Sequence, residues 1–388
     1  MRTLYAIGMR VALVGALCAA LVSGCAQETT EMPLDPATNP GMSGGESAVK
    51  QRAERPIEPR PEVPSRPPAA VDVPAKAVNG TLYVALRPLA DQVGGSVAHD
   101  PVEGTIEAAI GGHRFSWIVG APVLSRDGVF LPGDFTPVVE GKEIWVPLAF
   151  VRDGLRWPAQ TAEGGRIRLA VQNATVEAAK PQPNRPALAT LRAADVAAYL
   201  QHLSPPIRGA RLSSRASHLP GAPRSYREGV HEGIDWYSGY TGVAITRSTP
   251  VVAMADGVVV RADRAYREMP KAERDRLLAE CRRLGRTPAH ILDRLRGRTV
   301  WVQHDGGLLT RYAHLSAVAD GIDVGARVKR GQVLGYVGNS GTSSGVAGTD
   351  EDLHLHLDIL VYGEPFWKYL RSDEIRLVLE AVFSPEKR

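Results

Sequence analysis

The sequence has little cysteine, few aromatic residues and no strong excess of charge of either sign. Only 3 of its 388 residues are cysteine (Cys18, Cys25 and Cys281), which excludes a disulfide scaffold and a zinc site built from cysteine. Lys and Arg number 46 against 42 Asp and Glu, and this net charge of +4 does not predict nucleic-acid binding. The mean hydropathy of −0.14 excludes a polytopic membrane protein. The length allows two or three domains.

The longest apolar run lies near the start of the chain, at residues 11–22, behind Arg2 and Arg10. It is too short for a comfortable transmembrane helix and fits a secretory signal. The run leads into the sequence LVSGC, which ends at Cys25 and resembles the bacterial lipobox. That resemblance implies that residues 1–25 are a lipoprotein signal peptide. Cys25 would then be acylated and would anchor the exported chain in the cell membrane or outer membrane, facing the cell wall or periplasm. An ordinary signal peptide, with Cys25 incidental, is the alternative.

The next segment, residues 26–78, is rich in proline and poor in large apolar side chains. Ten of the 29 prolines fall between Gln27 and Gly80. Such a segment cannot offset its ordering entropy by burial. We therefore expect a disordered, Pro-rich tether.

Residues 79–173 contain an internal repeat, in which YVALRPLA (83–90) is echoed by WVPLAFV (145–151). Each copy predicts a strand, a short helix, a glycine turn and two further strands, at 96–99 and 105–110 in the first copy and at 155–158 and 166–171 in the second. We expect the two copies to pack on each other. The segment resembles the N-terminal domain of some copper amine oxidases, although not their copper-binding part, and we interpret it as a stalk or wall-binding module. A Pro-containing linker is expected at 174–189.

The C-terminal half, residues 190–388, predicts a mainly β domain. A helix is expected at 190–203, and the residues His304-Asp305-Gly306-Gly307 predict a hairpin. Short β-branched runs predict strands at 251–254, 257–261, 299–303, 308–313 and 332–337. The fold class expected for the chain is therefore α+β and mainly β: an antiparallel-sheet domain preceded by a small two-repeat α+β module.

A helical hairpin is expected as an insertion at about 264–298. Apolar residues recur there at helical spacing, and each of the two runs ends at a glycine. The segment holds 11 Lys and Arg against 5 Asp and Glu, so the basic charge of the chain is concentrated in it. It is interpreted either as a lid or contact for anionic wall polymer, or as an ordinary solvated hairpin.

Six of the ten histidines lie between His231 and His356. The sequence HEGID (231–235) sets a His and an Asp four residues apart; the final Asp and the internal Gly separate it from the zincin motif His-Glu-x-x-His. In His354-Leu355-His356 the alternation predicts a strand with both imidazoles on one face, where they can converge on one ion. A third histidine, His314, ends the predicted strand 308–313 in the sequence RYAHLS.

Taken in order, HEGID, RYAHLS, VKRGQVLG (328–335) and HLH resemble the lysostaphin-type (LytM-like) zinc endopeptidases. The resemblance covers about residues 205–365. It implies that His231, Asp235 and His356 bind Zn²⁺, and that His314 and His354 are the catalytic histidines that do not bind metal. Of these two, His354 is favoured as the base, since its neighbour on the same strand face is a ligand.

The function implied is zinc-dependent hydrolysis of peptide bonds in peptidoglycan cross-links or stem peptides. The alternative is a catalytically silent envelope regulator that binds peptidoglycan or activates an amidase. All five positions are filled here, which favours the enzyme. The chain departs from the family in a longer, acidic stretch at 341–352 and in the helical insertion, and both departures bear on substrate preference.

Overall fold

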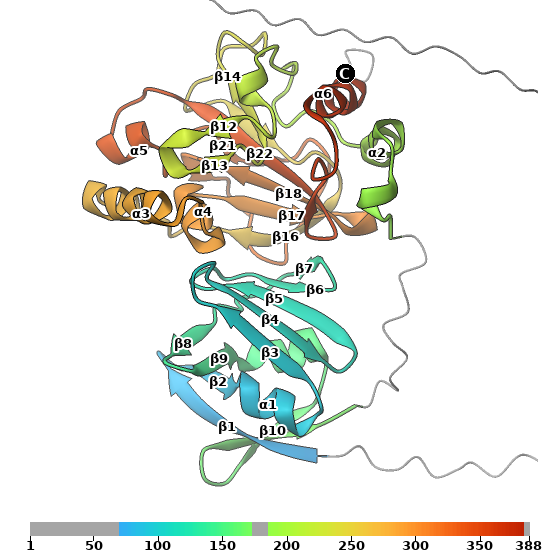
Figure 1. Ribbon diagram of the computed structural model, residues 1–388, viewed down its shortest axis with the longest axis vertical. Coiled ribbons are helices and arrows are strands. Elements are labelled where there is room, and N and C mark those ends of the chain that lie inside the picture. Colours follow the sequence, from blue (N-terminus) through green and yellow to red (C-terminus); the bar gives the residue numbers. More distant parts are fainter. Residues whose placement is uncertain (1–69, 173–184, 384–388) are drawn as a thin grey trace, which may run out of the picture. The chain divides into compact units, whose positions relative to one another are not determined.

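The computed structural model describes residues 70–172 and 185–383 (Figure 1). These ranges contain one large apolar core built by residues 73–171 and another built by residues 188–383. The predicted signal peptide and Cys25 lie outside the described residues, as do most of the predicted tether and linker. Within the described ranges, no helix has the length and apolar character needed to cross a bilayer.

Residues 70–172 form two antiparallel sheets and one α-helix, α1 (Leu86–Gln92). The six-stranded sheet has the order β10-β11-β1-β2-β9-β8, and the five-stranded sheet runs from β3 to β7 in sequence order. The strands are β1 (Ala70–Val78), β2 (Thr81–Ala85), β3 (Ser96–Asp100), β4 (Thr105–Ile110), β5 (His113–Ile118), β6 (Leu124–Arg126), β7 (Val129–Leu131), β8 (Val138–Glu140), β9 (Glu143–Pro147), β10 (Ala159–Ala162) and β11 (Arg166–Ala170).

The two repeat copies meet in the six-stranded sheet, where β2 of the first copy pairs antiparallel with β9 of the second. Helix α1 follows β2, and a π-helical turn (Phe150–Leu155) occupies the equivalent place after β9. Leu89 of α1 and Phe150 are both buried in the same core. The predicted packing of one copy on the other is thus confirmed. The strand predicted at 155–158 is wrong: Leu155 still belongs to the π-helical turn, and the strand begins at Ala159.

Two expected boundaries also need correction. Strand β1 lies inside the segment expected to be a disordered tether. It forms because small apolar residues alternate along it, because Val73 is fully buried, and because it pairs with both β11 and β2. The high proline content of the segment led to the prediction of disorder instead. At the other boundary, Leu188 already packs in the second core, so the linker expected at 174–189 ends earlier than predicted.

Residues 185–383 are built on antiparallel sheets, as predicted. The largest has the order β14-β22-β18-β17-β16-β20, with β23 paired to β22; β15-β21-β19 and β12-β13 form smaller sheets. The strands are β12 (Pro223–Arg224), β13 (Gly229–Val230), β14 (Ile234–Tyr237), β15 (Pro250–Val252), β16 (Gly257–Ala262), β17 (Val300–Gln303), β18 (Leu308–Ala313), β19 (Ala317–Val318), β20 (Arg327–Val328), β21 (Val333–Tyr336), β22 (His354–Val361) and β23 (Glu364–Pro365).

Helix α2 (Ala193–Leu200) packs against α6 (Ser372–Val382). It is shorter than the helix predicted at 190–203, because Leu188–Thr190 forms a separate 3-10 turn and the chain turns again before Ser204. A short helix, α5 (Ser343–Ala347), lies in the acidic stretch before β22. The predicted hairpin between β17 and β18 is confirmed, with its turn at Asp305–Gly307.

The predicted helical insertion is present as α3 (Lys271–Leu284) and α4 (Ala289–Leu295), between the paired strands β16 and β17 (Figure 1). Helix α3 ends at Gly285, whose φ of 64° lies in the left-handed region that favours glycine. Cys281, Ile291 and Leu295 are buried between the two helices as a small core of their own. The hairpin is therefore a packed element.

Candidate active site

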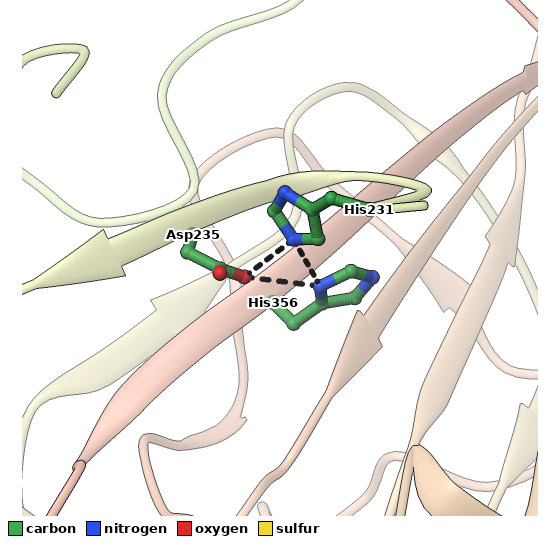
Figure 2. A group of neighbouring side chains, drawn as sticks. All are labelled: His231, Asp235 and His356. Carbon is green, nitrogen blue, oxygen red and sulfur yellow. Dashed lines mark hydrogen bonds and ion pairs between the residues drawn. The ribbon is translucent and has the colours of Figure 1, made fainter. Parts of the chain in front are cut away.

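Two adjacent strands bring the HEGID and HLH sequences together. Strand β14 pairs antiparallel with β22 in a register that sets Asp235 opposite His356, and His231 lies just before β14. His231 Nε2 lies 2.9 Å from Asp235 Oδ1 and 3.0 Å from His356 Nδ1, and the last two atoms are 3.0 Å apart (Figure 2). The three residues are 2–6% exposed. Among the described residues, they form the one cluster of His, Cys, Asp or Glu that could hold a metal ion.

The outer hydrogen bonds of the two imidazoles fix where their protons lie. His231 Nδ1 donates to the carbonyl oxygen of Leu219 at 3.0 Å, and His356 Nε2 donates to Asp358 Oδ1 at 2.9 Å. Both partners can only accept, so a neutral ring at either position turns its other nitrogen, with a lone pair, toward Asp235 Oδ1. With both rings neutral, three buried acceptors would face one another. A proton on His356 Nδ1 relieves this arrangement, and a metal cation can take the place of that proton. Two nitrogens and one carboxylate oxygen are ligands that zinc accepts, at about 2.0–2.2 Å.

Arg224 holds the other oxygen of the central carboxylate. Its Nη2 donates to Asp235 Oδ2 at 3.0 Å, which leaves Oδ1 directed at the two imidazoles. Burial alone would raise the pKa of Asp235, but the charge of His231 and the hydrogen bonds from His231 and His356 keep that pKa well below its usual value. Asp235 is therefore an anion, as a metal ligand must be.

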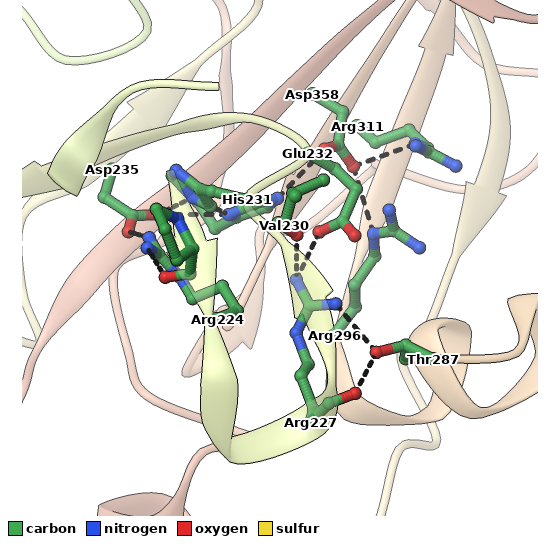
Figure 3. A network of polar contacts seen from close by, with 12 residues as sticks. Arg224, Arg227, Val230, His231, Glu232, Asp235, Thr287, Arg296, Arg311 and Asp358 are labelled. Atoms are coloured by element: carbon green, nitrogen blue, oxygen red, sulfur yellow. Dashed lines mark hydrogen bonds and ion pairs between the residues drawn. The ribbon is translucent and has the colours of Figure 1, made fainter. Parts of the chain in front are cut away.

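Asp358, which accepts the hydrogen bond from His356, belongs to a buried charge network with Arg296 and Arg311 (Figure 3). Asp358 is 1% exposed, and its Oδ2 lies 3.0 Å from the Nε of both Arg296 and Arg311. Burial raises the pKa of Asp358, but these two guanidinium groups outweigh burial and hold it well below its usual range. Burial likewise disfavours a charged His356, yet the charge of Asp358 and hydrogen bonds to Asp235 and Asp358 raise the pKa of His356 to about 9. A metal ion would compete with that proton at Nδ1.

His314 and His354 lie beside the cluster, and each donates from Nδ1 to a backbone carbonyl oxygen. His314 follows β18 with a φ of 60° and donates from Nδ1 to the carbonyl oxygen of Ser340 at 2.7 Å. His354 donates from Nδ1 to the carbonyl oxygen of Asp352 at 2.7 Å and stacks on Tyr237, with ring centroids 4.3 Å apart. The two imidazoles are 4.8 Å apart. In both, Nε2 is the ring nitrogen that makes no hydrogen bond to the described residues, and that of His354 lies 3.9 Å from Asp235 Oδ1.

The same two histidines are neutral in the resting site. Burial, followed by repulsion from His354 and His356, lowers the pKa of His314 well below its ordinary value. Burial also lowers the pKa of His354, although the charge of Asp235 opposes it. Neutral rings whose Nδ1 carries the proton offer Nε2 as a proton acceptor.

A groove of about 540 Å³ contains this whole arrangement. The three clustered residues, His314 and His354 line it, together with Tyr237 and Tyr240. The helical insertion contributes Arg274, Leu292, Leu295 and Arg296 to the lining, and residues 341–343 also line it. The groove is therefore bounded partly by strands that carry the histidines and partly by helices absent from the predicted family pattern.

The structure thus brings His231, Asp235 and His356 into one cluster and places His314 and His354 in the same groove. Sequence reasoning did not single out Arg224 or Asp358. Asp358 follows His356 by two residues on the same strand, and the alternation that grouped the histidines could have found it. Arg224 has no such local signal.

Known proteins resemble two parts of the chain. Residues 285–366 match the model of peptidase family M23, and residues 66–167 match that of the copper amine oxidase N-terminal domain. Peptidoglycan DD-endopeptidase ShyA of Vibrio cholerae is 30% identical over 155 residues, which cover 40% of this chain and 26% of that protein. DD-carboxypeptidase/endopeptidase Mpg of Neisseria meningitidis is 29% identical over 162 residues, which cover 41% and 27%.

Among solved structures, the catalytic domain of lysostaphin from Staphylococcus simulans shares 20% identity at a TM-score of 0.25, covering 44% of this chain and 89% of that one. The chain spans about a quarter of the length of the two curated relatives. The M23 match includes His314, His354 and His356 and begins after the HEGID sequence. Peptidases of this family depend on zinc. The chain therefore contains a peptidase family M23 domain and a copper amine oxidase N-terminal-like domain, as its motifs predicted.

Proposed function

We propose that this chain is a zinc-dependent endopeptidase that hydrolyses peptide bonds in peptidoglycan, in its stem peptides or their cross-links. The observation that carries the proposal is the convergence of three buried acceptor atoms beside two neutral histidines in one open groove. The names of the two curated relatives, both peptidases of the DD type, support the choice of substrate.

His231, Asp235 and His356 are assigned as the Zn²⁺ ligands. Three protein ligands leave a position for water or substrate, as catalytic zinc sites require. When bound, zinc supplies a Lewis acid that polarises the scissile carbonyl and lowers the pKa of a water molecule toward about 7. Arg224 and Asp358 orient Asp235 and His356 through the oxygen and nitrogen atoms that face away from the metal.

His354 is assigned as the general base. Its Nε2 lies 3.9 Å from Asp235 Oδ1, so it faces the ligand cluster, and its neutral state lets it accept a proton from the attacking water. The proton on Nε2 can then pass to the leaving amine. His314 lines the same groove, and its neutral ring, with the proton on Nδ1 bonded to the Ser340 carbonyl oxygen, makes its Nε2 a second candidate acceptor for the proton of the water.

A second candidate function is the catalytically silent envelope regulator, which would bind peptidoglycan or activate an amidase. It fits the groove equally well as a binding surface, but it gives no reason for two neutral histidines with free Nε2 atoms beside the ligand cluster. We therefore favour the enzyme.

We further propose that the chain is exported and anchored in the envelope through a lipid on Cys25, with the copper amine oxidase N-terminal-like module serving as a stalk or wall-binding unit. The mass of the amino-terminal peptide tests the anchor directly. An acylated Cys25 at the new amino terminus is expected, and an unmodified Cys25 inside the mature chain would contradict it.

The decisive experiment for the enzyme uses the full chain in detergent with purified peptidoglycan, followed by mass spectrometry of the products. New peptide ends are expected with zinc. They should be lost with a chelator and in His354→Ala, and retained in His99→Ala, a histidine outside the groove. Absence of new ends from a folded, zinc-loaded chain would favour the regulator.

A further inference from the structure

Several contacts hold the helical insertion on the catalytic domain, and two of them involve residues that line the groove. The backbone of Gly341 lies so close to the carbonyl oxygen of Leu295, at the end of α4, that a Cβ on Gly341 would stand 2.4 Å from it. In the turn between the helices, the hydroxyl of Thr287 accepts a hydrogen bond from Arg227 Nη1 at 3.1 Å and donates one to the Arg227 carbonyl oxygen (Figure 3). The backbone of the insertion is thus packed against the domain, and the insertion forms part of the groove lining.

The arginines that line the groove differ in whether a carboxylate of the chain pairs with them. Four arginines line the groove, and three of them form ion pairs with carboxylates at 3.0 Å or less: Arg224 with Asp235, Arg227 with Glu232 and Arg296 with Asp358. The fourth, Arg274, lies on α3 and has no carboxylate within 4.0 Å in residues 70–172 or 185–383. It is the lining arginine whose charge the described chain leaves available.

The surroundings of Arg274 suit an anion. Its side chain is half-buried, and its one hydrogen bond to the described chain is a long one, from Nε to the carbonyl oxygen of Gly341 at 3.4 Å. The Nη groups are therefore free to make a bidentate pair with a carboxylate, the geometry that guanidinium favours. Leu292 and Leu295 of the same insertion also line the groove, and apolar neighbours strengthen such a pair by lowering the local dielectric constant.

We propose that Arg274 binds a free carboxylate of the peptide that is cut, so that the insertion selects carboxylate-bearing peptides over their amidated forms. The proposal rests on the endopeptidase function proposed above. It gives the insertion a role inside the groove through Arg274, its one basic residue that lines the groove without a carboxylate partner in the described chain.

The test compares two substrates and four proteins. The substrates are a cross-linked stem-peptide dimer with free carboxylates, released from peptidoglycan, and the same dimer after chemical amidation. The proteins are the full chain, Arg274→Gln, Arg274→Lys and the control Arg276→Gln, which removes the same charge from an exposed site on the same helix. A charged hydrogen-bonded pair predicts that the full chain prefers the free carboxylate by about 10- to 100-fold in kcat/KM.

Arg274→Gln should cut both dimers equally, at the rate at which the full chain cuts the amidated dimer. Arg274→Lys should restore part of the preference, because it restores charge without the bidentate fork, and Arg276→Gln should keep all of it. A full chain that cuts both dimers equally well would overturn the proposal and leave the endopeptidase function intact.

A binding measurement separates failure of the proposal from failure of the function. Titration of both dimers into His354→Ala, with and without Arg274→Gln, measures affinity without turnover. We expect the carboxylate dimer to bind about 10- to 100-fold more tightly only when Arg274 is present. If no protein cuts either dimer, the endopeptidase function fails, and this titration still decides the role of Arg274: equal affinities for the two dimers would exclude it.

Discussion

The two described regions bury different kinds of side chain. Among the polar and charged residues of 70–172, Ser125 alone is buried, and the core is built around Phe115, Trp117 and Phe150. Residues 185–383 bury four histidines together with aspartates and arginines. A buried charge costs free energy unless it is paired, and several of the buried charges of this second region are paired around the candidate site. The comparison separates a region whose interior serves stability from one whose interior serves a site.

The strongest test of this difference removes one clustered histidine. His356→Ala should abolish zinc binding and lower the rate of cleavage at least about 1,000-fold, or roughly 4 kcal/mol of activation free energy, because two ligands do not hold a catalytic zinc. Zinc content by mass spectrometry and the product assay measure both effects. The matched control is His113→Ala, since His113 also contacts a carboxylate, that of Asp127 at 2.6 Å, but belongs to the first region. Loss of zinc in His113→Ala would show that histidines of both regions affect zinc binding, contrary to the comparison.

In residues 70–172, by contrast, we expect a core substitution to lower stability without changing zinc binding. Phe150 is fully buried, with its ring centroid 5.1 Å from that of Trp117. Phe150→Ala should lower the free energy of unfolding of this region by about 3–5 kcal/mol, as measured by denaturant titration followed by tryptophan fluorescence. Leu377→Ala, at a side chain 60% exposed, should change stability by less than about 0.5 kcal/mol. Zinc affinity that falls together with the stability of Phe150→Ala would show that the two interiors are not independent.

Within residues 185–383, the next prediction compares two buried aspartates, one that contacts His356 and one that does not. Asp358→Asn removes the anion that fixes the His356 ring, and it should weaken zinc affinity about 10- to 100-fold. Asp293→Asn is the control, because Asp293 is also a buried partner of an arginine, Arg261 at 2.6 Å, without contact to a metal ligand. Both variants should lose stability. Equal zinc affinities in the two would contradict a positioning role for Asp358.

The smallest expected effect concerns pH. His304 is buried, with ring nitrogens 2.8 Å from the Asp256 carbonyl oxygen and from the Thr310 hydroxyl, and burial lowers its pKa. Below a pH of about 6.5 the unfolded chain therefore binds a proton that the folded chain does not, and the free energy of unfolding falls as pH decreases. His304→Gln should flatten this fall between about pH 6.5 and 5, measured by urea titration. An unchanged pH dependence would show that His304 titrates alike in both states.

For much of residues 185–383, the local sequence pattern was sufficient to predict the secondary structure. The alternation around His354 predicted the start of β22, and the glycines after each apolar run predicted the ends of α3 and α4. These features depend on the spacing of neighbouring residues. The order of the motifs also predicted the peptidase family M23 domain.

Features that depend on distant contacts could not be predicted. Nothing near Arg224 indicates that its guanidinium will meet Asp235, because that contact requires β12 to lie beside the cluster. Strand β1 was missed because its pairing with β11, about 90 residues away in sequence, outweighs its unfavourable composition. The π-helical turn that ends at Leu155 likewise depends on how Phe150 and Val151 enter the core.

The insertion leaves the sheet at Ala262 and returns at Val300, and these two residues are paired neighbours on adjacent antiparallel strands. A segment whose ends already lie side by side can be replaced by another of different length without disturbing the ladder. The strand that carries His354 and His356 is separated from this junction by β18. Such an exchange would have to keep Arg296, because its guanidinium pairs with Asp358 beside His356 and its carbonyl oxygen accepts a hydrogen bond from the backbone of His314. Evolution or engineering could then vary helices α3 and α4 and, under the proposed function, change which peptides are accepted.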